Sequence, residues 1–148
     1  MSAQAIRVMQ ECLKTKKRYL DLGNCGLTDN DFAEGNSVDK LLRQCTHLEI
    51  LILSNNWVDP PAKKHSKSKG NGNKLNRPPG ALKLLKTLST LICAGEIGNE
   101  WGIDDISFVA YLTSLTILNV SHNQVRKIEG KRQCFFVVAH RVCSRKSL

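Results

Sequence analysis

The chain has 148 residues and a formal net charge of +9, from 22 basic and 13 acidic residues. Its length suits one domain, and an apolar content of 41% is enough to build a core. No stretch approaches the roughly 18 apolar residues of a membrane-spanning helix, and the first residues lack the apolar run of a secretory signal. We therefore expect no contact with a membrane and a cytoplasmic location, or a nuclear one if the basic segments act as an address.

The positive charge lies in two segments of the chain. Residues 62–86 contain eight Lys or Arg and no acidic residue, and residues 126–148 contain seven basic residues and Glu129. The rest of the chain is mildly acidic. In the expected compartment, the six cysteines should be reduced thiols.

The first predicted element is a helix over residues 3–16. Ile6, Met9 and Leu13 are spaced to share one helical face, and Ser2 is suited to cap the N-terminus. Because residues 1–16 lead directly into the first predicted strand, we expect them to form a cap over the open edge of that strand.

From residue 17 the chain repeats the frame L-x-x-L-x-L-x-x-N/C-x-L. The segments LEILILSNNWV and LTILNVSHNQV fit it fully, whereas KRYLDLGNCGL has Lys17 in the first slot. In LSTLICAGEIG, Glu96 replaces the asparagine and Gly98 the last leucine. The frames begin at residues 17, 48, 88 and 115, and two of these steps exceed the usual length of about 20–29 residues, which predicts insertions.

Each frame predicts a short strand followed by a sharp turn; the strands are Tyr19–Leu22, Ile50–Leu53, Thr90–Cys93 and Ile117–Val120. Backbone polar groups leave the sheet ladder at these turns and face the interior, where an unpaired group costs about 1–3 kcal/mol. An Asn side chain both donates and accepts, so Asn56 and Asn123 should form a structural ladder, with Cys25 as a weak donor in it. The alternative is that both are ordinary turn asparagines. An ionised Glu96 cannot donate, so the third repeat should be distorted there.

The segments between and after the frames differ in character. Phe32, Val38, Leu41 and Leu42 favour a helix that returns to the second frame. Residues 60–80 are rich in Pro, Gly, Ser and Lys, which predicts a disordered basic insert. Residues 131–148 form a basic tail outside the frame. Its run CFFVVAHRV is apolar enough for a strand or cap, and the alternative is a non-native end of a truncated product.

These frames resemble the leucine-rich repeat family over residues 17–128, and we assign the repeats to residues 17–130. The resemblance implies an α/β fold, a short solenoid with a curved parallel sheet on its concave face. The convex side would be helical or irregular, and the N-terminus would carry a helical cap. A helix followed by YLDLGNCGLTD, together with ISFVAYLTSLTILNVSHNQV, is similar to repeats attached to larger signalling proteins, including the Roco GTPase group.

The resemblance further implies a non-enzymatic protein–protein interaction module that binds a protein partner on the concave face. Residues between the apolar slots should point out of that face, and the mixed, weakly charged set suits a protein partner. The predicted contact residues are Tyr19, Asp21, Glu49, Ile50, Ile52, Ser54, Asn55, Thr90, Ile92, Thr116, Ile117, Asn119, Ser121 and His122. The alternative for this surface is an ordinary solvated sheet face.

Two other functions are open. The basic insert from Lys63 to Lys86 is suited to nucleic acid or acidic surfaces, although it has no aromatic residue to stack on bases and is more typical of a solvated loop. The chain is alternatively a truncated fragment with no function of its own. Cys134, His140 and Cys143 lie close in sequence but lack the fourth ligand of a zinc site. We predict no metal, cofactor or catalytic residue.

Overall fold

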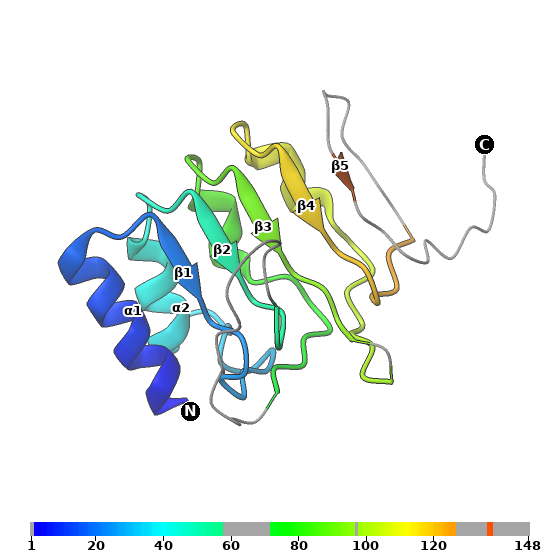
Figure 1. The fold of residues 1–148 in the computed structure, drawn as a ribbon, viewed down its shortest axis with the longest axis horizontal. Helices are drawn as coiled ribbons and strands as arrows, with labels where there is room; N and C mark the ends of the chain where they lie inside the picture. The colour runs from blue at the N-terminus through cyan, green and yellow to red at the C-terminus, as the bar shows by residue number, and fades with distance from the viewer. Residues whose placement is uncertain (1, 58–71, 97, 127–135, 138–148) are drawn as a thin grey trace.

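The computed structural model describes residues 2–57, 72–96 and 98–126 and the backbone of residues 136–137. Helices, strands and 3-10 turns alternate along these residues (Figure 1). In chain order they are α1 (Ala3–Thr15), β1 (Tyr19–Asp21), α2 (Ser37–Gln44), β2 (Ile50–Ile52), η1 (Gly80–Leu84), β3 (Thr90–Ile92), η2 (Ser107–Tyr111), β4 (Ile117–Asn119) and β5 (Phe136–Val137).

The strands form one parallel sheet in the order β1-β2-β3-β4-β5, so each strand pairs with the next one in the sequence. The register aligns the middle leucines of the first four strands, and all four are buried. These are Leu20, Leu51, Leu91 and Leu118. The four predicted strands are confirmed to within one residue. β5 places a strand in the tail, where the sequence left open a strand, a cap or a non-native end.

The helix α1 begins as predicted, because the side chain of Ser2 accepts a hydrogen bond from the backbone N–H of Ala5 at 3.2 Å. It ends where Lys16 adopts a left-handed conformation with φ of 54°. Its buried residues, Ala5, Met9 and Cys12, join the core. The helix lies beside β1 at the end of the sheet (Figure 1).

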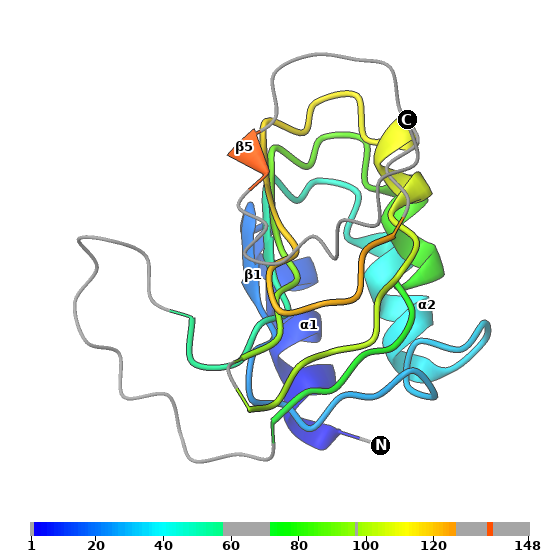
Figure 2. The ribbon, with the colours of Figure 1, turned by 90° about the vertical axis from the view of Figure 1, so that its right-hand side faces the viewer.

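The second layer is made of α2, η1 and η2. It faces the sheet from the other side of the repeats (Figure 2). α2 is an α-helix, whereas η1 and η2 are 3-10 turns, and this difference follows the length of the connections. Leu48 follows Leu27 by 21 positions, whereas Leu88 follows Leu75 by only 13. The shorter connection accommodates the tighter 3-10 turn, which rises about 2 Å per residue. The aliphatic core lies between the two layers.

Asn73 pairs the backbone groups at the ends of the first two strands. Its Oδ1 atom accepts from the N–H groups of Cys25 at 3.1 Å and Leu27 at 2.8 Å. Its Nδ2 atom donates to the carbonyl oxygens of Leu22 at 2.8 Å and Leu53 at 2.7 Å. The side chain is fully buried. One amide therefore pairs four backbone groups from two successive repeats.

Asn123 has the same role at the third and fourth strands. Its Oδ1 accepts from the N–H of Ile103 at 3.2 Å, and its Nδ2 donates to the carbonyls of Cys93 at 2.8 Å and Val120 at 3.2 Å. This confirms the ladder prediction for Asn123. Cys25 occupies the equivalent place in the first repeat, with its Sγ 3.6 Å from the carbonyl oxygen of Gly23.

The ladder prediction for Asn56 is wrong, because the chain leaves the repeat after Leu53 and returns only at Asn73. Asn56 is exposed and has a φ of 50°. It bridges two neighbours instead: its Oδ1 accepts from Nδ2 of Asn24, and its Nδ2 donates to Oε1 of Glu96, both at 3.0 Å. The asparagine that fits the frame by spacing is therefore a turn residue.

With Asn73 at the ladder position, the insertion in the second repeat lies before that position. Asn73 follows Leu53 by 20 positions, whereas Asn123 follows Val120 by 3, so the second repeat carries 17 extra residues before its ladder position. The disordered insert predicted over residues 60–80 is wrong for its last part, because Asn73 and Leu75 are fully buried. Residues 58–71 lie outside the described part of the chain, so the prediction for them stays a prediction.

The third repeat departs from the frame near Glu96, as the sequence predicts. Trp101 occupies the ladder position and is fully buried, and its backbone N–H donates to the carbonyl of His122 at 2.8 Å. Its indole Nε1 has no hydrogen-bond partner in the described structure. Trp101 follows Cys93 by 8 positions, so the third repeat carries 5 extra residues before its ladder position, although its overall step is of usual length.

Replacing Asn73 with alanine tests its role in the ladder. The Asn73→Ala variant leaves four buried backbone groups without the amide, at about 1–3 kcal/mol each, so we expect the free energy of unfolding to fall by at least about 4 kcal/mol. Urea titration followed by circular dichroism measures the loss. Asn56→Ala is the matched control and should cost less than about 1 kcal/mol. If both variants lost the same free energy of unfolding, Asn56 would be as important to the ladder as Asn73, and the assignment of Asn73 would be contradicted.

The buried thiol of Cys93 predicts a pH dependence of stability. Burial raises the pKa of Cys93 from 9.0 to about 12. Between these values the unfolded chain releases the thiol proton and the folded chain keeps it. The stabilisation is therefore complete below pH 9 and is lost as the pH rises toward 12, at about 1.4 kcal/mol per pH unit. Urea titrations of wild type and Cys93→Ala from pH 8 to 11 should show a shallower decline in the variant; parallel curves would contradict the assignment.

Candidate functional site

The first residue of each strand points out of the sheet face opposite the core. The register aligns four such residues side by side across β1, β2, β3 and β4, and we call them the sheet-face row: Tyr19, Ile50, Thr90 and Ile117. Tyr19 is 46% exposed and Ile117 is 43% exposed, and the two residues between them are half-buried. The row thus presents apolar and aromatic surface to solvent across four repeats.

The third residue of each strand forms a parallel second row. Ile52 and Ile92 are its middle members, and they are 1% and 3% exposed although neither belongs to the hydrophobic core cluster. Asp21 and Asn119 stand at its two ends. The centre of the sheet face is therefore aliphatic, with polar side chains at its margins.

Six predicted contact residues are buried, so the prediction that they offer a binding surface is wrong. They are Ile52, Ser54, Asn55, Ile92, Asn119 and Ser121. The polar members are buried and bond backbone groups where the strands end. The Oγ of Ser54 accepts from the N–H of Ala94 at 2.6 Å, and the Oδ1 of Asn119 accepts from the N–H of Ser121 at 3.0 Å.

Asn55 shows most clearly why such a residue cannot face a partner. Its Oδ1 accepts from the N–H groups of Asn24 at 3.1 Å and Asn73 at 2.7 Å, and its Nδ2 donates to the carbonyl of Asn73 at 3.0 Å. Asn55 thereby holds the ladder residue Asn73 in place. Its function in the described structure is to join two repeats.

The other eight predicted contact residues are accessible. Tyr19, Thr116 and Ile117 are exposed, and Asp21, Glu49, Ile50, Thr90 and His122 are half-buried. Glu49 pairs with Arg18 at 3.0 Å. Both side chains of this pair are largely exposed, so the pair contributes little to stability and leaves the margin of the face polar.

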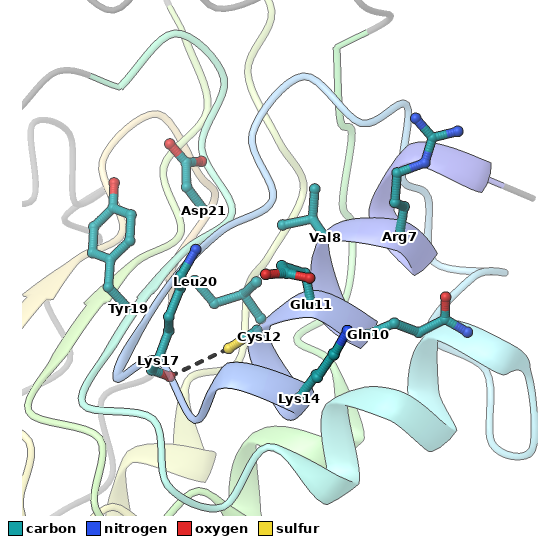
Figure 3. Close-up of a pocket in the computed structure, with 10 residues that line it drawn as sticks. All are labelled: Arg7, Val8, Gln10, Glu11, Cys12, Lys14, Lys17, Tyr19, Leu20 and Asp21. Atoms are coloured by element: carbon teal, nitrogen blue, oxygen red, sulfur yellow. Dashed lines mark hydrogen bonds between the residues drawn. The ribbon is translucent and has the colours of Figure 1, made fainter.

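A cleft between α1 and β1 continues the sheet face at its N-terminal end (Figure 3). Its volume is about 640 Å³. Residues of both elements line it: Arg7, Val8, Gln10, Glu11, Cys12, Lys14, Lys17, Tyr19, Leu20 and Asp21. Tyr19 and Asp21 belong to both the cleft and the sheet face. The sequence analysis missed the contribution of α1, although polar residues at helical spacing away from Met9 marked the exposed side of that helix.

A basic and aromatic cluster lies on the other layer of the molecule. The ammonium groups of Lys83 and Lys86 lie 5.3 and 5.7 Å from the ring centroid of Tyr111. Tyr111 is 49% exposed, and Leu84 of η1 is also exposed. The run of lysines from Lys63 to Lys69, which the alternative function needs, lies outside the described residues. The prediction for that run is not tested by this structure.

Within residues 2–57, 72–96 and 98–126, no helix has the length and apolar character to cross a bilayer. The same residues contain no group of three His, Cys, Asp or Glu side chains arranged to hold a metal ion. The candidate zinc ligands Cys134, His140 and Cys143 lie outside the described part of the chain.

Comparison with known proteins agrees with the repeat frames. The family model described as Leucine Rich repeat matches residues 44–61 and 111–127, which contain β2 and β4. Podocan from Mus musculus is 31% identical over 123 residues, which cover 77% of this chain and 19% of Podocan. The chain therefore spans about a fifth of the length of this curated relative.

Four aligned strands with leucines at the repeated slots define an α/β fold built of repeats. With the family match and the similarity to Podocan, they show that the chain is a leucine-rich repeat protein. Neither comparison concerns the Roco GTPase group, so that resemblance stays a prediction.

Asn119 at the end of β4 and Thr116 just before its start provide a test that separates structural from surface residues. Asn119→Ala removes the acceptor for the N–H of Ser121 and should lower the free energy of unfolding by about 1–2 kcal/mol. Thr116→Ala alters an exposed side chain and should change it by less than about 0.5 kcal/mol. Thermal and urea unfolding measure both. If Asn119→Ala left the free energy of unfolding unchanged, Asn119 would again be a candidate for the binding surface.

Proposed function

We propose that the protein is a non-enzymatic interaction module that binds a protein partner on its sheet face. The observation that carries the proposal is the sheet-face row, in which exposed Tyr19 and Ile117 flank two half-buried residues at the same register. A partner laid across β1 to β4 would contact all four residues without any rearrangement of the sheet.

The chemistry of the face suits a protein better than a phosphate-bearing ligand. Tyr19 and Ile117 expose apolar surface, and a partner that covers them removes that surface from water at about 25 cal/mol per Å². Tyr19 offers an aromatic ring at one end, and aromatic residues are enriched at protein interfaces. The Arg18–Glu49 pair supplies a polar margin without a strong net charge.

The proposal includes two features of the architecture. The repeats form a short leucine-rich repeat solenoid with the sheet on its concave side, and α1 acts as the N-terminal cap. Support for the cap comes from the burial of Ala5, Met9 and Cys12 and from partial burial of Ile6 and Leu13 in the same core. Without α1, the apolar edge of the first repeat would lose this cover.

Charge substitutions on the sheet face test the binding site. Affinity capture with the full chain recovers partners, and calorimetry then measures their dissociation constants for wild type, Thr90→Arg and Ile117→Arg. Because both changes place a cation in the sheet-face row, which carries no charged residue, we expect at least tenfold weaker binding of a sheet-face partner.

Ala110→Arg is the matched control, because Ala110 is exposed on η2 in the other layer and the change adds the same charge. Circular dichroism first checks that all three variants keep the wild-type fold. Partners that bind all three variants as tightly as wild type would rule out the sheet face as their site.

Salt dependence separates this function from binding by the basic segment. Association through an apolar centre should change little between 50 and 500 mM salt, whereas nucleic-acid binding by the lysines would weaken by orders of magnitude. A recovered partner that is lost at 500 mM salt and unaffected by Ile117→Arg would favour the basic alternative. The cytoplasmic or nuclear location stays a prediction.

A further inference from the structure

A second group of exposed apolar side chains lies in the layer opposite the sheet. Within the described part of the chain, four large apolar side chains are exposed, and two of them belong to the sheet-face row. The other two are Leu84 of η1, which is 44% exposed, and Tyr111 of η2, which is 49% exposed. η1 and η2 are in contact and lie in the same layer (Figure 2). The large apolar surface that the sheet-face row does not use is therefore gathered on these two turns.

Two lysines hold the ring of Tyr111. The Nζ atoms of Lys83 and Lys86 lie 5.3 and 5.7 Å from its centroid, within the range of about 6 Å for a cation–π contact. The Nζ of Lys86 also donates to the backbone carbonyl of Tyr111 at 3.3 Å. The basic and aromatic cluster thus consists of Lys83, Leu84, Lys86 and Tyr111, and all four are exposed.

The positive charge of this cluster has no acidic counterpart on the same two turns. Neither η1 nor η2 contains an acidic residue. Asp105 stands six positions before Tyr111, about 12 Å along a 3-10 turn, and its carboxylate accepts from the N–H of Ser107 at 2.8 Å. On the neighbouring α2, the carboxylate of Asp39 is buried and pairs with Arg43 at 2.8 Å. The surface around Tyr111 is therefore locally positive.

We propose that the basic and aromatic cluster is a docking site for an acidic peptide segment of a protein partner, in which carboxylates flank an apolar side chain. The carboxylates pair with Lys83 and Lys86, and the apolar side chain covers Leu84 and Tyr111. Charge complementarity selects the segment, and burial of apolar and aromatic surface holds it. The site lies in the other layer from the sheet-face row, so it goes beyond the proposed function and is tested separately from it.

The contacts within the cluster leave the lysines able to bind carboxylates. An ammonium group has three N–H donors, and Lys86 uses one of them for the carbonyl of Tyr111. The cation–π contacts use the charge of each ammonium group and not its N–H donors in particular. They also hold two flexible side chains beside the ring, so less freedom is lost when a segment binds.

A peptide suits this cluster better than a nucleic acid does. Binding to a phosphate backbone grows with the number of cations that neutralise phosphates, and the cluster supplies two. A base stacks on the face of an aromatic ring, but the ammonium groups of Lys83 and Lys86 already lie over Tyr111. A carboxylate binds these ammonium groups without displacing them. Leu84 adds apolar surface, which matches an apolar side chain.

Fluorescence anisotropy with the full chain and a defined probe tests the preferred chemistry. The probe is a labelled peptide made of three copies of Glu-Glu-Phe-Glu. One reference peptide has Gln in place of every Glu, and another has Ser in place of every Phe. Each lacks half of the recognition, so we expect both to bind at least tenfold more weakly than the probe. No saturable binding of the probe up to about 1 mM protein, or equal binding of all three peptides, would overturn the proposal.

Variants of the full chain locate the binding. Lys83→Glu reverses one charge and Tyr111→Ser removes the ring, and each should weaken binding of the probe at least tenfold. Lys74→Glu is the matched control, because Lys74 is exposed and its backbone pairs with Thr28 of the first repeat. Circular dichroism checks that every variant keeps the wild-type fold. If Lys74→Glu weakens binding as much as Lys83→Glu, the probe responds to overall charge and the proposal is wrong.

Competition with single-stranded DNA of similar length and charge tests the other class of ligand. We expect the DNA to displace the labelled peptide at least tenfold less effectively than unlabelled peptide does. If the DNA binds more tightly than the peptide, and Lys83→Glu and Tyr111→Ser both weaken its binding, the cluster is a nucleic-acid site and the proposed occupant is wrong.

Discussion

The fold depends on how backbone polar groups are paired where parallel strands end inside the molecule. Within the described part of the chain, asparagine occupies the ladder position in the second and fourth repeats alone, as Asn73 and Asn123. Each bonds its own strand end and that of the preceding repeat, which carries Cys25 or Trp101 instead. One asparagine thus serves two repeats, and an asparagine in alternate repeats is sufficient. The alignment of the strands, and with it the sheet-face row, follows from this pairing.

The sequence predicts the strands well because the leucines within a strand are two residues apart, and side chains of a strand alternate between its two faces with the same period of two. Leu51 and Leu53 face the core on either side of an outward Ile52, as alternation requires. The period fails where connections vary in length. Counting positions along the repeat frame places the ladder residue at Asn56. The correct ladder residue is marked by Asn73-x-Leu75, which repeats the N-x-L end of the frame after the basic segment. The 3-10 turns were missed too, because their short connections set the turn type and leave no periodic pattern.

The same reasoning explains which part of the binding surface the sequence predicts. Alternation places Tyr19 and Ile117 on the open face, and both are exposed. It does not extend past the strand, where Ser54 and Asn55 turn inward to bond backbone groups. Polarity alone does not distinguish a side chain that faces a partner from one that bonds backbone groups inside the protein. For a related reason the sequence left a strand at β5 as one of several alternatives, because Val137 stands in a frame of cysteine, valine and alanine without any leucine.

The chain leaves the second repeat at Leu53 and returns at Asn73, and these two points are joined by a hydrogen bond of 2.7 Å. The two ends of the insertion are therefore anchored to each other by the ladder itself. Closing a loop between fixed ends costs only about 0.6 kcal/mol more for each doubling of its length. The second repeat is thus an insertion site. A peptide, an epitope or a small domain can be added there, by evolution or by design, while the register of the surrounding repeats is preserved.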